Sequence, residues 1–251
     1  MSRKPLIAGN WKMHLSVAQA VELARGLAAE ADKHQDREVM LAPAFIALDA
    51  VHKAISDSKT FLAAQNVAWA EEGAFTGEVS APMLRDVGVA MAIIGHSERR
   101  QIFGEDDAMI NRRIHGALAG GIIPVFCIGE TLEQREAEQT FKVLEGQLSA
   151  GLADCTAEMV ARMVIAYEPV WAIGTGKTAS KEQAQEVHGY IRQLLLQKYE
   201  KKVAEAVRIV YGGSVKPDNV DALMAQADID GALVGGAALK FESFARIINF
   251  K

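Results

Sequence analysis

Eight short apolar runs that alternate with stretches of helical periodicity limit the possible folds of this chain more than any other feature. The runs span residues 5–10, 38–43, 60–65, 89–95, 122–128, 163–167, 207–211 and 229–234. Between them, apolar residues recur at helical spacing in residues 16–32, 106–119, 132–151, 181–199 and 219–227. Nearly continuous apolar strands joined by helices indicate a parallel sheet whose outer face is covered. The pattern is typical of an α/β protein.

The number of strand–helix units distinguishes two arrangements of such a sheet. Eight units in 251 residues match a closed (β/α)8 barrel. An open doubly wound sheet is the alternative, but the Gly-x-Gly-x-x-Gly turn that is typical of it is absent after the first strand. The chain also has no linker, low-complexity stretch or break in composition. We therefore expect a single closed (β/α)8 barrel domain over residues 1–251.

Charge, hydropathy and cysteine content exclude several classes of function. The net charge is −5, and acidic and basic residues are mixed along the chain without a basic stripe for nucleic acid. No apolar run reaches the ~20 residues that span a bilayer, and the first run is too short for a signal peptide. Cys127 and Cys155 lie in apolar contexts without a Cys-x-x-Cys pair, which favours reduced, buried thiols. We expect a cytoplasmic protein that binds neither nucleic acid nor a membrane.

Polar residues and glycines follow most of the predicted strands. In barrels of this kind, the active site lies at the carboxyl ends of the strands. The residues at these ends include Asn10, Lys12, Gln65, Asn66, His96, Ser97, Glu98, Glu168, Ser214, Gly235 and Gly236. Because the strand ends share one rim of the barrel, we expect these residues to converge on a single site.

The loop after the sixth strand predicts a carboxylate beside a lid. Pro169 biases Glu168 away from helix, so that the acid lies where the strand stops. Trp171 and two glycines, Gly174 and Gly176, follow, as in a short hinged loop whose amides can meet a ligand. The loop continues Gly-Lys-Thr, but a nucleotide-binding P-loop requires a glycine where Trp171 stands. A base beside a lid suggests chemistry that must be kept from water.

Lys12 is the candidate for stabilising negative charge, and His96 is the candidate for donating a hydrogen bond to a carbonyl. A lysine after a strand is most often solvated, but Lys12 stands two residues from Asn10, between a strand and a helix, where its ammonium can stabilise developing negative charge. His96 could be a structural histidine, yet the helical turn expected from Ser97 would favour a neutral ring that donates to a carbonyl. Glu98 could pair with Lys12, or only complement the start of the helix.

Two glycine pairs close the last two strands. Gly212 and Gly213 precede Ser214, and Gly235 and Gly236 follow the eighth strand. A single pair is a weak turn signal, but phosphate sites in this fold are built after strands seven and eight. Glycines let backbone amides approach a phosphate, and a helix N-terminus after Gly236 would favour its charge. We therefore expect a phosphate site there.

A polar loop at residues 73–80 carries an aromatic residue between glycines. Phe75 and Thr76 form its tip. A mobile surface loop is the simpler interpretation, but a protruding aromatic tip favours docking into a second subunit. The loop therefore predicts a homo-oligomer.

Over its entire length, the chain resembles the triosephosphate isomerase family. The matching motifs are residues 9–13, 73–80, 95–100, 127–130, 166–177, 211–214 and 235–236. The resemblance implies a TIM barrel that interconverts dihydroxyacetone phosphate and D-glyceraldehyde 3-phosphate in glycolysis and gluconeogenesis. It also implies catalysis without metal or cofactor, and a homodimer formed through the loop at residues 73–80.

The same resemblance, and not the residue patterns, implies the individual roles. Glu168 would move a proton between the carbons next to the carbonyl, and His96 would serve the oxygens of the enediolate. The negative charge would be steadied by Lys12 and Asn10. The phosphate would be held by Asn10, Lys12, Gly174, Ser214, Gly235 and Gly236. Support behind the reacting groups would come from Ser97, Glu98 and Cys127. Contact with the second subunit would come from Phe75 and Thr76.

Two further functions are compatible with a barrel of this kind. An aldolase-like enzyme would need a lysine with a lowered pKa for a Schiff base, whereas Lys12 beside Asn10 and Glu98 favours a permanent cation. A catalytically silent phosphate-binding barrel would have no reason to keep Glu168, His96 and Lys12 together. Hydrolysis through Ser97 is disfavoured because no Gly-x-Ser-x-Gly turn surrounds it.

Overall fold

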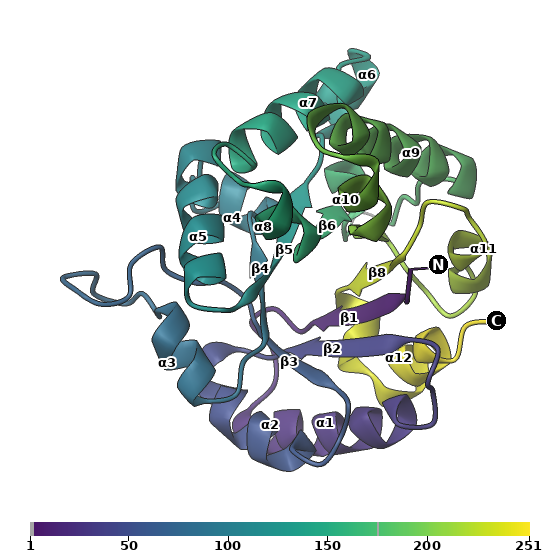
Figure 1. Cartoon of the computed structure of the whole chain (residues 1–251). Helices are drawn as coiled ribbons and strands as arrows, with labels where there is room; N and C mark the ends of the chain where they lie inside the picture. Colours follow the sequence, from purple (N-terminus) through teal and green to yellow (C-terminus); the bar gives the residue numbers. More distant parts are fainter. Residues whose placement is uncertain (1–2, 175) are drawn as a thin grey trace.

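The computed structural model describes residues 3–174 and 176–251, and a closed barrel of eight parallel strands forms its centre (Figure 1). The strands are β1 (Leu6–Asn10), β2 (Glu38–Ala42), β3 (Phe61–Ala64), β4 (Met91–Ile94), β5 (Ile123–Ile128), β6 (Val164–Tyr167), β7 (Arg208–Tyr211) and β8 (Gly231–Val234). Strand β1 pairs with both β2 and β8, which closes the sheet. The prediction of a closed (β/α)8 barrel is confirmed, and every strand lies within its predicted range.

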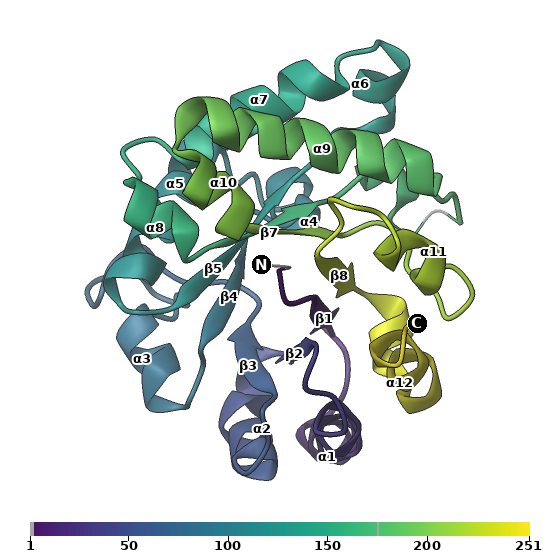
Figure 2. The ribbon, with the colours of Figure 1, turned by 45° about the vertical axis from the view of Figure 1, so that its right-hand side comes forward.

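Helices surround the strands on the outside of the barrel (Figure 2). They are α1 (Val17–Ala31), α2 (Leu48–Ile55), α3 (Ala81–Asp86), α4 (Ser97–Gln101), α5 (Asp107–Ala119), α6 (Leu132–Glu136), α7 (Thr140–Gly151), α8 (Ala157–Ala161), α9 (Lys181–Lys198), α10 (Lys201–Ala206), α11 (Val220–Met224) and α12 (Phe241–Ile248). Short 3-10 turns are η1 (Phe45–Ala47), η2 (Val170–Ala172) and η3 (Gly236–Leu239). Among the described residues, no helix is long and apolar enough to cross a membrane.

Two of the predicted helices differ from those observed. The range 132–151, predicted as one helix, is split into α6 and α7, because Glu138 between them has a left-handed φ of 56°. A right-handed helix cannot continue through a residue in that conformation. Glutamate is a good helix former, so the periodicity gave no sign of the break. The second difference is α11, which covers less than the predicted range 219–227.

Residues of each strand alternate between the barrel interior and the layer under the helices. In β1, Leu6 and Ala8 belong to one buried cluster, whereas Ile7 belongs to another. The cluster of Leu6 takes alternate residues from all eight strands and fills the barrel interior. Cys127 of β5 belongs to this interior cluster. Both Cys127 and Cys155 are buried free thiols, as the sequence predicted.

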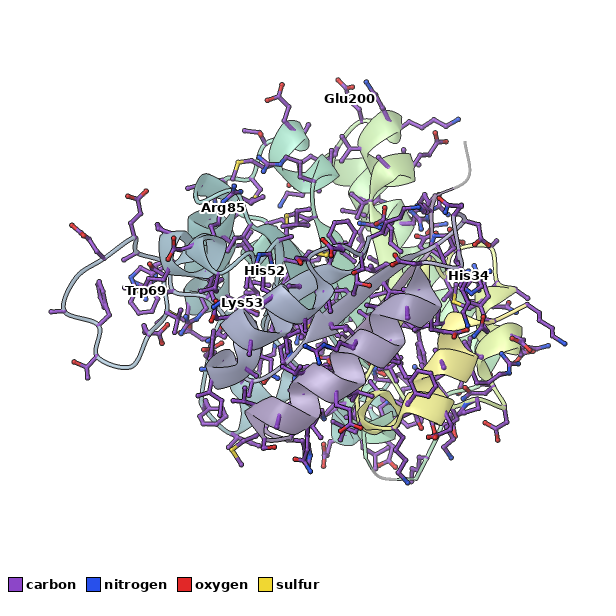
Figure 3. All side chains as sticks on the ribbon, turned by 90° about the horizontal axis from the view of Figure 1, so that it is seen from below. His34, His52, Lys53, Trp69, Arg85 and Glu200 are labelled. Carbon is purple, nitrogen blue, oxygen red and sulfur yellow. The ribbon has the colours of Figure 1, made fainter. Side chains whose placement is uncertain are left out.

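The loop between β3 and α3 projects away from the barrel (Figure 1). Its tip carries Phe75, whose ring packs edge-on against Trp69 at a centroid distance of 5.1 Å. Figure 3 shows Trp69 at the base of this loop. Close to the base, the Arg113 guanidinium donates to both oxygens of Glu78, at 2.7 and 3.0 Å. The loop is therefore fixed at its base while its tip, with Thr76, stays exposed.

Candidate active site

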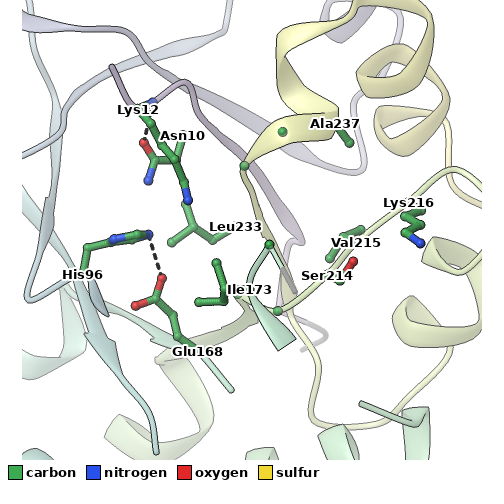
Figure 4. Close-up of a pocket in the computed structure, with 15 residues that line it drawn as sticks. Asn10, Lys12, His96, Glu168, Ile173, Ser214, Val215, Lys216, Leu233 and Ala237 are labelled. Atoms are coloured by element: carbon green, nitrogen blue, oxygen red, sulfur yellow. Dashed lines mark hydrogen bonds and ion pairs between the residues drawn. The ribbon is translucent and has the colours of Figure 1, made fainter. Parts of the chain in front are cut away.

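A cavity of about 250 Å³ lies at the carboxyl ends of the strands (Figure 4). Its lining includes Asn10, Lys12, His96, Glu168, Gly174, Ser214, Gly235 and Gly236. These residues end or follow strands β1, β4, β6, β7 and β8, which are far apart in the sequence. The structure thus brings together every residue that the sequence and the resemblance assigned to proton transfer or phosphate binding.

Glu168 directly follows β6 and is almost fully buried, with 2% of its surface exposed. Its Oε1 lies 3.0 Å from Nε2 of His96, and its Oε2 accepts a hydrogen bond from the Ser97 amide at 2.9 Å. The Glu168 amide donates to the carbonyl of Ile128 at 2.8 Å, which fixes the backbone. Both carboxylate oxygens are therefore held at the end of β4, on one wall of the cavity. A ligand in the cavity would meet this carboxylate at close range.

His96 lies between β4 and α4 and is the N-cap residue of that helix. Its Nδ1 accepts a hydrogen bond from the Glu98 amide at 3.2 Å, which places the proton of a neutral ring on Nε2, facing Glu168. Burial lowers the pKa of His96, but the Glu168 and Glu98 carboxylates outweigh burial and raise that pKa above its ordinary value. The Glu98 amide therefore supports the neutral ring that the sequence predicts. The Glu168 carboxylate, in contrast, favours the charged ring.

Removing the charge of Glu168 is expected to lower the pKa of His96. In Glu168→Gln, the ring keeps its burial and the Glu98 amide but loses the carboxylate that raises its pKa. A ¹⁵N NMR titration of the imidazole measures this pKa in both proteins. Glu133→Gln, on the exposed side of α6, is the control and should leave the pKa unchanged. A His96 pKa that stays the same in Glu168→Gln would contradict the cause assigned here.

Lys12 is held in an unusual backbone conformation beside the cavity. Its φ is 53°, a left-handed value that is uncommon outside glycine and that clusters at functional sites. The Lys12 amide donates to Oδ1 of Asn10 at 3.0 Å, and its carbonyl accepts from Nε2 of Gln65 at 2.7 Å. Its Nζ lies 2.6 Å from Oε1 of Glu98. The ion pair of Lys12 with Glu98 that the sequence suggested is present.

Glycines and Ser214 form the other end of the cavity. The stem of Lys12 runs past Gly235, where an added Cβ would lie 3.3 Å from Cε of the lysine. At Gly174 the φ of 70° requires a residue that tolerates left-handed backbone. The helix expected after Gly236 is a 3-10 turn of four residues, η3, so it offers less of a helix dipole than predicted. The remaining lid residue, Thr175, lies outside the described residues.

Ser97 and Cys127, to which the resemblance gives a supporting role, lie close to Glu168 and in the barrel interior, respectively. The Ser97 amide contacts Glu168, as described above. Cys127 is fully buried in the barrel interior. Burial raises the pKa of the Cys127 thiol well above its usual range, and the Glu168 charge acts in the same direction. This thiol therefore stays protonated and unreactive.

Comparison with known proteins identifies the family of the chain. A sequence model of triosephosphate isomerase matches residues 5–251. The chain belongs to the triosephosphate isomerase family. It is 53% identical over 249 residues to the triosephosphate isomerase of Geobacter metallireducens, covering 99% of each chain. It is also 53% identical over 249 residues to those of Rhodopirellula baltica and Chloroflexus aurantiacus, with 99% of this chain covered and 98% and 100% of theirs.

The triosephosphate isomerase motif at residues 127–130 contains a residue whose role the sequence did not reveal. Glu130 is fully buried and accepts hydrogen bonds from the Tyr167 hydroxyl at 3.1 Å and from Nε1 of Trp171 at 2.9 Å. Trp171 belongs to η2, directly before the glycines of the lid. Glu130 therefore fixes the start of the loop that the sequence predicts to be a lid. The motif itself was visible in the sequence, but its contact with Trp171 depends on the closed barrel.

The cavity of this triosephosphate isomerase homologue also contains residues that sequence reasoning did not single out. Ile173, Leu233 and Ala237 add apolar surface to the lining, and Lys216 adds a positive charge. Over residues 3–174 and 176–251, no group of three or more His, Cys, Asp and Glu is arranged to hold a metal ion.

Proposed function

We propose that this enzyme interconverts dihydroxyacetone phosphate and D-glyceraldehyde 3-phosphate through an enediolate, in glycolysis and gluconeogenesis and without a cofactor. The observation that carries the proposal is the convergence of Glu168, His96 and Lys12 beside a glycine-rich wall in one cavity. Membership of the triosephosphate isomerase family supports the choice of substrate.

Proton transfer is assigned to Glu168. The substrate carries its exchangeable protons on two adjacent carbons, so one carboxylate that reaches both can remove a proton from one and return it to the other. In the structure, both oxygens of Glu168 are held by His96 and Ser97. The carboxylate therefore has to turn from the Ser97 amide toward the substrate. That turn also removes from His96 the charge that raises its pKa.

Stabilisation of the negative charge on the enediolate is assigned to His96 and Lys12. A neutral His96 donates from Nε2 to the substrate oxygens once Glu168 has turned away. The ammonium of Lys12, fixed by Glu98 and by its strained backbone, attracts the negative charge that develops there. Asn10 keeps Lys12 in place through its Oδ1. These groups are already arranged before the ligand arrives, which lowers the reorganisation needed in the transition state.

Phosphate binding is assigned to Gly174, Ser214, Gly235 and Gly236. Ser214 lies at the end of the cavity away from His96 (Figure 4), and the three glycines also line this cavity. Binding at this end, far from the reacting carbons, provides energy for closing the lid. Closure excludes water and protects the enediolate from losing its phosphate. The contacts of Trp171 with Glu130 define the fixed end of the moving loop.

The whole chain is proposed to be one barrel domain that functions in the cytoplasm as a homodimer. Large apolar side chains are exposed around the projecting loop and beside the cavity, among them Met13 at 92%, Ile46 at 78% and Phe103 at 66%. A second cavity connects Met13 and Phe103 with Lys12. Exposed apolar surface of this extent favours a partner. A second copy whose loop brings Phe75 and Thr76 onto this surface would cover it.

Charging the loop tip is expected to separate the subunits. In Thr76→Glu, a carboxylate would be buried at the proposed interface, which costs several kcal/mol per unpaired charge, of order 3 kcal/mol or more. Sedimentation equilibrium should then show a monomer where the unaltered protein is a dimer. Lys202→Glu, on the exposed surface of α10, is the control and should remain dimeric. If Thr76→Glu sediments like the unaltered protein, this loop is not the interface.

Turnover of dihydroxyacetone phosphate tests the proposed function. Glyceraldehyde 3-phosphate formed by the purified protein is detected by coupling it to an oxidising dehydrogenase. Inorganic phosphate should act as a competitive inhibitor, because it occupies the glycine-rich end of the cavity. A folded protein that binds phosphate but forms no product would instead be the silent phosphate-binding barrel.

A further inference from the structure

The structure places one positive charge in the cavity that the proposed reaction does not use. Lys216 lies in the lining on the loop after β7 (Figure 4). We propose that Lys216 attracts the phosphate dianion toward the cavity, and so raises the rate at which phosphorylated trioses associate with the enzyme. This inference rests on the proposed function but assigns a residue and a step that the reaction itself does not require.

The other charged groups of the cavity wall have partners nearby, which distinguishes Lys216 from them. The charged side chains in the lining are Lys12, Glu168 and Lys216. Lys12 is paired with Glu98 at 2.6 Å, so these two charges largely cancel. Oε1 of Glu168 lies 3.0 Å from Nε2 of His96, so its charge also has a partner within the wall. Among residues 3–174 and 176–251, Lys216 is then the charged group of the lining that is left without an ion-pair partner, in a chain whose overall charge is −5.

Hydrogen bonds hold Lys216 in a fixed relation to the phosphate-binding wall. The Lys216 amide donates to Oδ1 of Asn219 at 2.8 Å, and Nδ2 of Asn219 donates to the carbonyl of Ser214 at 3.0 Å. One asparagine thus connects Lys216 to Ser214, which the proposal assigns to phosphate binding. Asp218, on the same turn, is exposed and is not part of the cavity lining.

The ammonium of Lys216 is also available to a ligand. Lys216 is exposed, and within residues 3–174 and 176–251 its Nζ takes part in no ion pair or side-chain hydrogen bond. Its backbone amide is used by Asn219, so any contact with phosphate comes from the side chain. A mobile, solvated ammonium acts through its long-range field, which raises association rates at low ionic strength and is screened by salt.

The test compares Lys216→Gln with Lys240→Gln. Lys240 is an exposed lysine directly before α12 that does not line the cavity. At an ionic strength near 10 mM, Lys216→Gln should lower kcat/KM for dihydroxyacetone phosphate about threefold to fivefold, with kcat unchanged. At 0.5 M salt, the difference should fall below about 1.5-fold. The inhibition constant of inorganic phosphate should rise in parallel at low salt. The unaltered protein, Lys216→Gln and Lys240→Gln should all turn over unphosphorylated glyceraldehyde at the same rate.

Each outcome distinguishes this inference from the proposed function. If the unaltered protein forms no product, the proposed function fails regardless of Lys216. If it forms product and Lys216→Gln behaves like Lys240→Gln at low salt, Lys216 does not attract the substrate. A lower kcat in Lys216→Gln, or a lower kcat/KM that persists at 0.5 M salt, would mean that Lys216 acts on loop structure or by direct contact. Either result would overturn long-range attraction.

Discussion

Glu168→Asp is expected to lower kcat by about 10²–10³, because the carboxylate is drawn back by about one carbon–carbon bond from the reacting carbons. The aspartate keeps the charge and the strand-end position of Glu168 but can no longer reach both carbons from β6. Steady-state kinetics in both directions measure the loss. The inhibition constant of inorganic phosphate should stay within about twofold, because the glycine-rich end of the cavity is untouched.

The control for this variant separates loss of the base from loss of the fold. Glu133→Asp shortens an exposed glutamate on α6 and should leave kcat unchanged. The far-UV circular dichroism of both variants should match that of the unaltered protein. If Glu168→Asp turned over dihydroxyacetone phosphate at the original rate, Glu168 would not be the base, and the role of the cavity would have to be reassigned.

Gly129→Ala is expected to damage both stability and turnover. An added Cβ at Gly129 would overlap the carbonyl oxygen of Glu168, so the backbone that carries the carboxylate must move. Gly129 cannot yield instead, since its amide and carbonyl are both bonded to the side chain of Gln147, at 2.8 and 3.1 Å. We expect a loss of roughly 1–3 kcal/mol in the free energy of unfolding. A shift of the Glu168 carboxylate by about 1 Å should also lower kcat by about 10².

Chemical denaturation and kinetics together test the effect of Gly129→Ala. The matched control is Gly146→Ala in α7, where an added Cβ meets no atom within 4 Å. That substitution should stabilise the protein by about 0.5–1 kcal/mol, as alanine generally does in a helix interior, and leave kcat unchanged. Full activity in Gly129→Ala would show that Glu168 does not depend on its contact with this glycine.

The fold was predictable because its signal is repeated along the whole chain. Eight apolar runs that alternate with helical stretches, most of them followed by polar residues or glycine, leave few arrangements other than a closed barrel. Closure then brings Asn10, His96, Glu168 and Gly235 to one rim without any further information. The break at Glu138 was not predictable, because a single left-handed residue in a good helix former leaves no trace in the periodicity.

The contacts between residues of the site were less predictable than the set of residues that form it. The pairing of Lys12 with Glu98 could be suggested from two strand ends. In contrast, the contacts of Ser97 and His96 with the two oxygens of Glu168 join residues 71 and 72 positions apart, which no local pattern records. Lys216 also escaped notice, because a lysine in a polar turn is ordinary until the wall of the cavity is known.

Proton NMR of dihydroxyacetone phosphate with the purified protein in D₂O tests the central claim most directly. If Glu168 removes a proton from C1 and returns one to C2, C1 of the remaining substrate should gain deuterium. Glyceraldehyde 3-phosphate carrying deuterium at C2 should appear with it, and both signals should be lost in Glu168→Gln. A folded protein that binds phosphate but leaves the C1 protons unexchanged would contradict proton transfer as the function of this cavity.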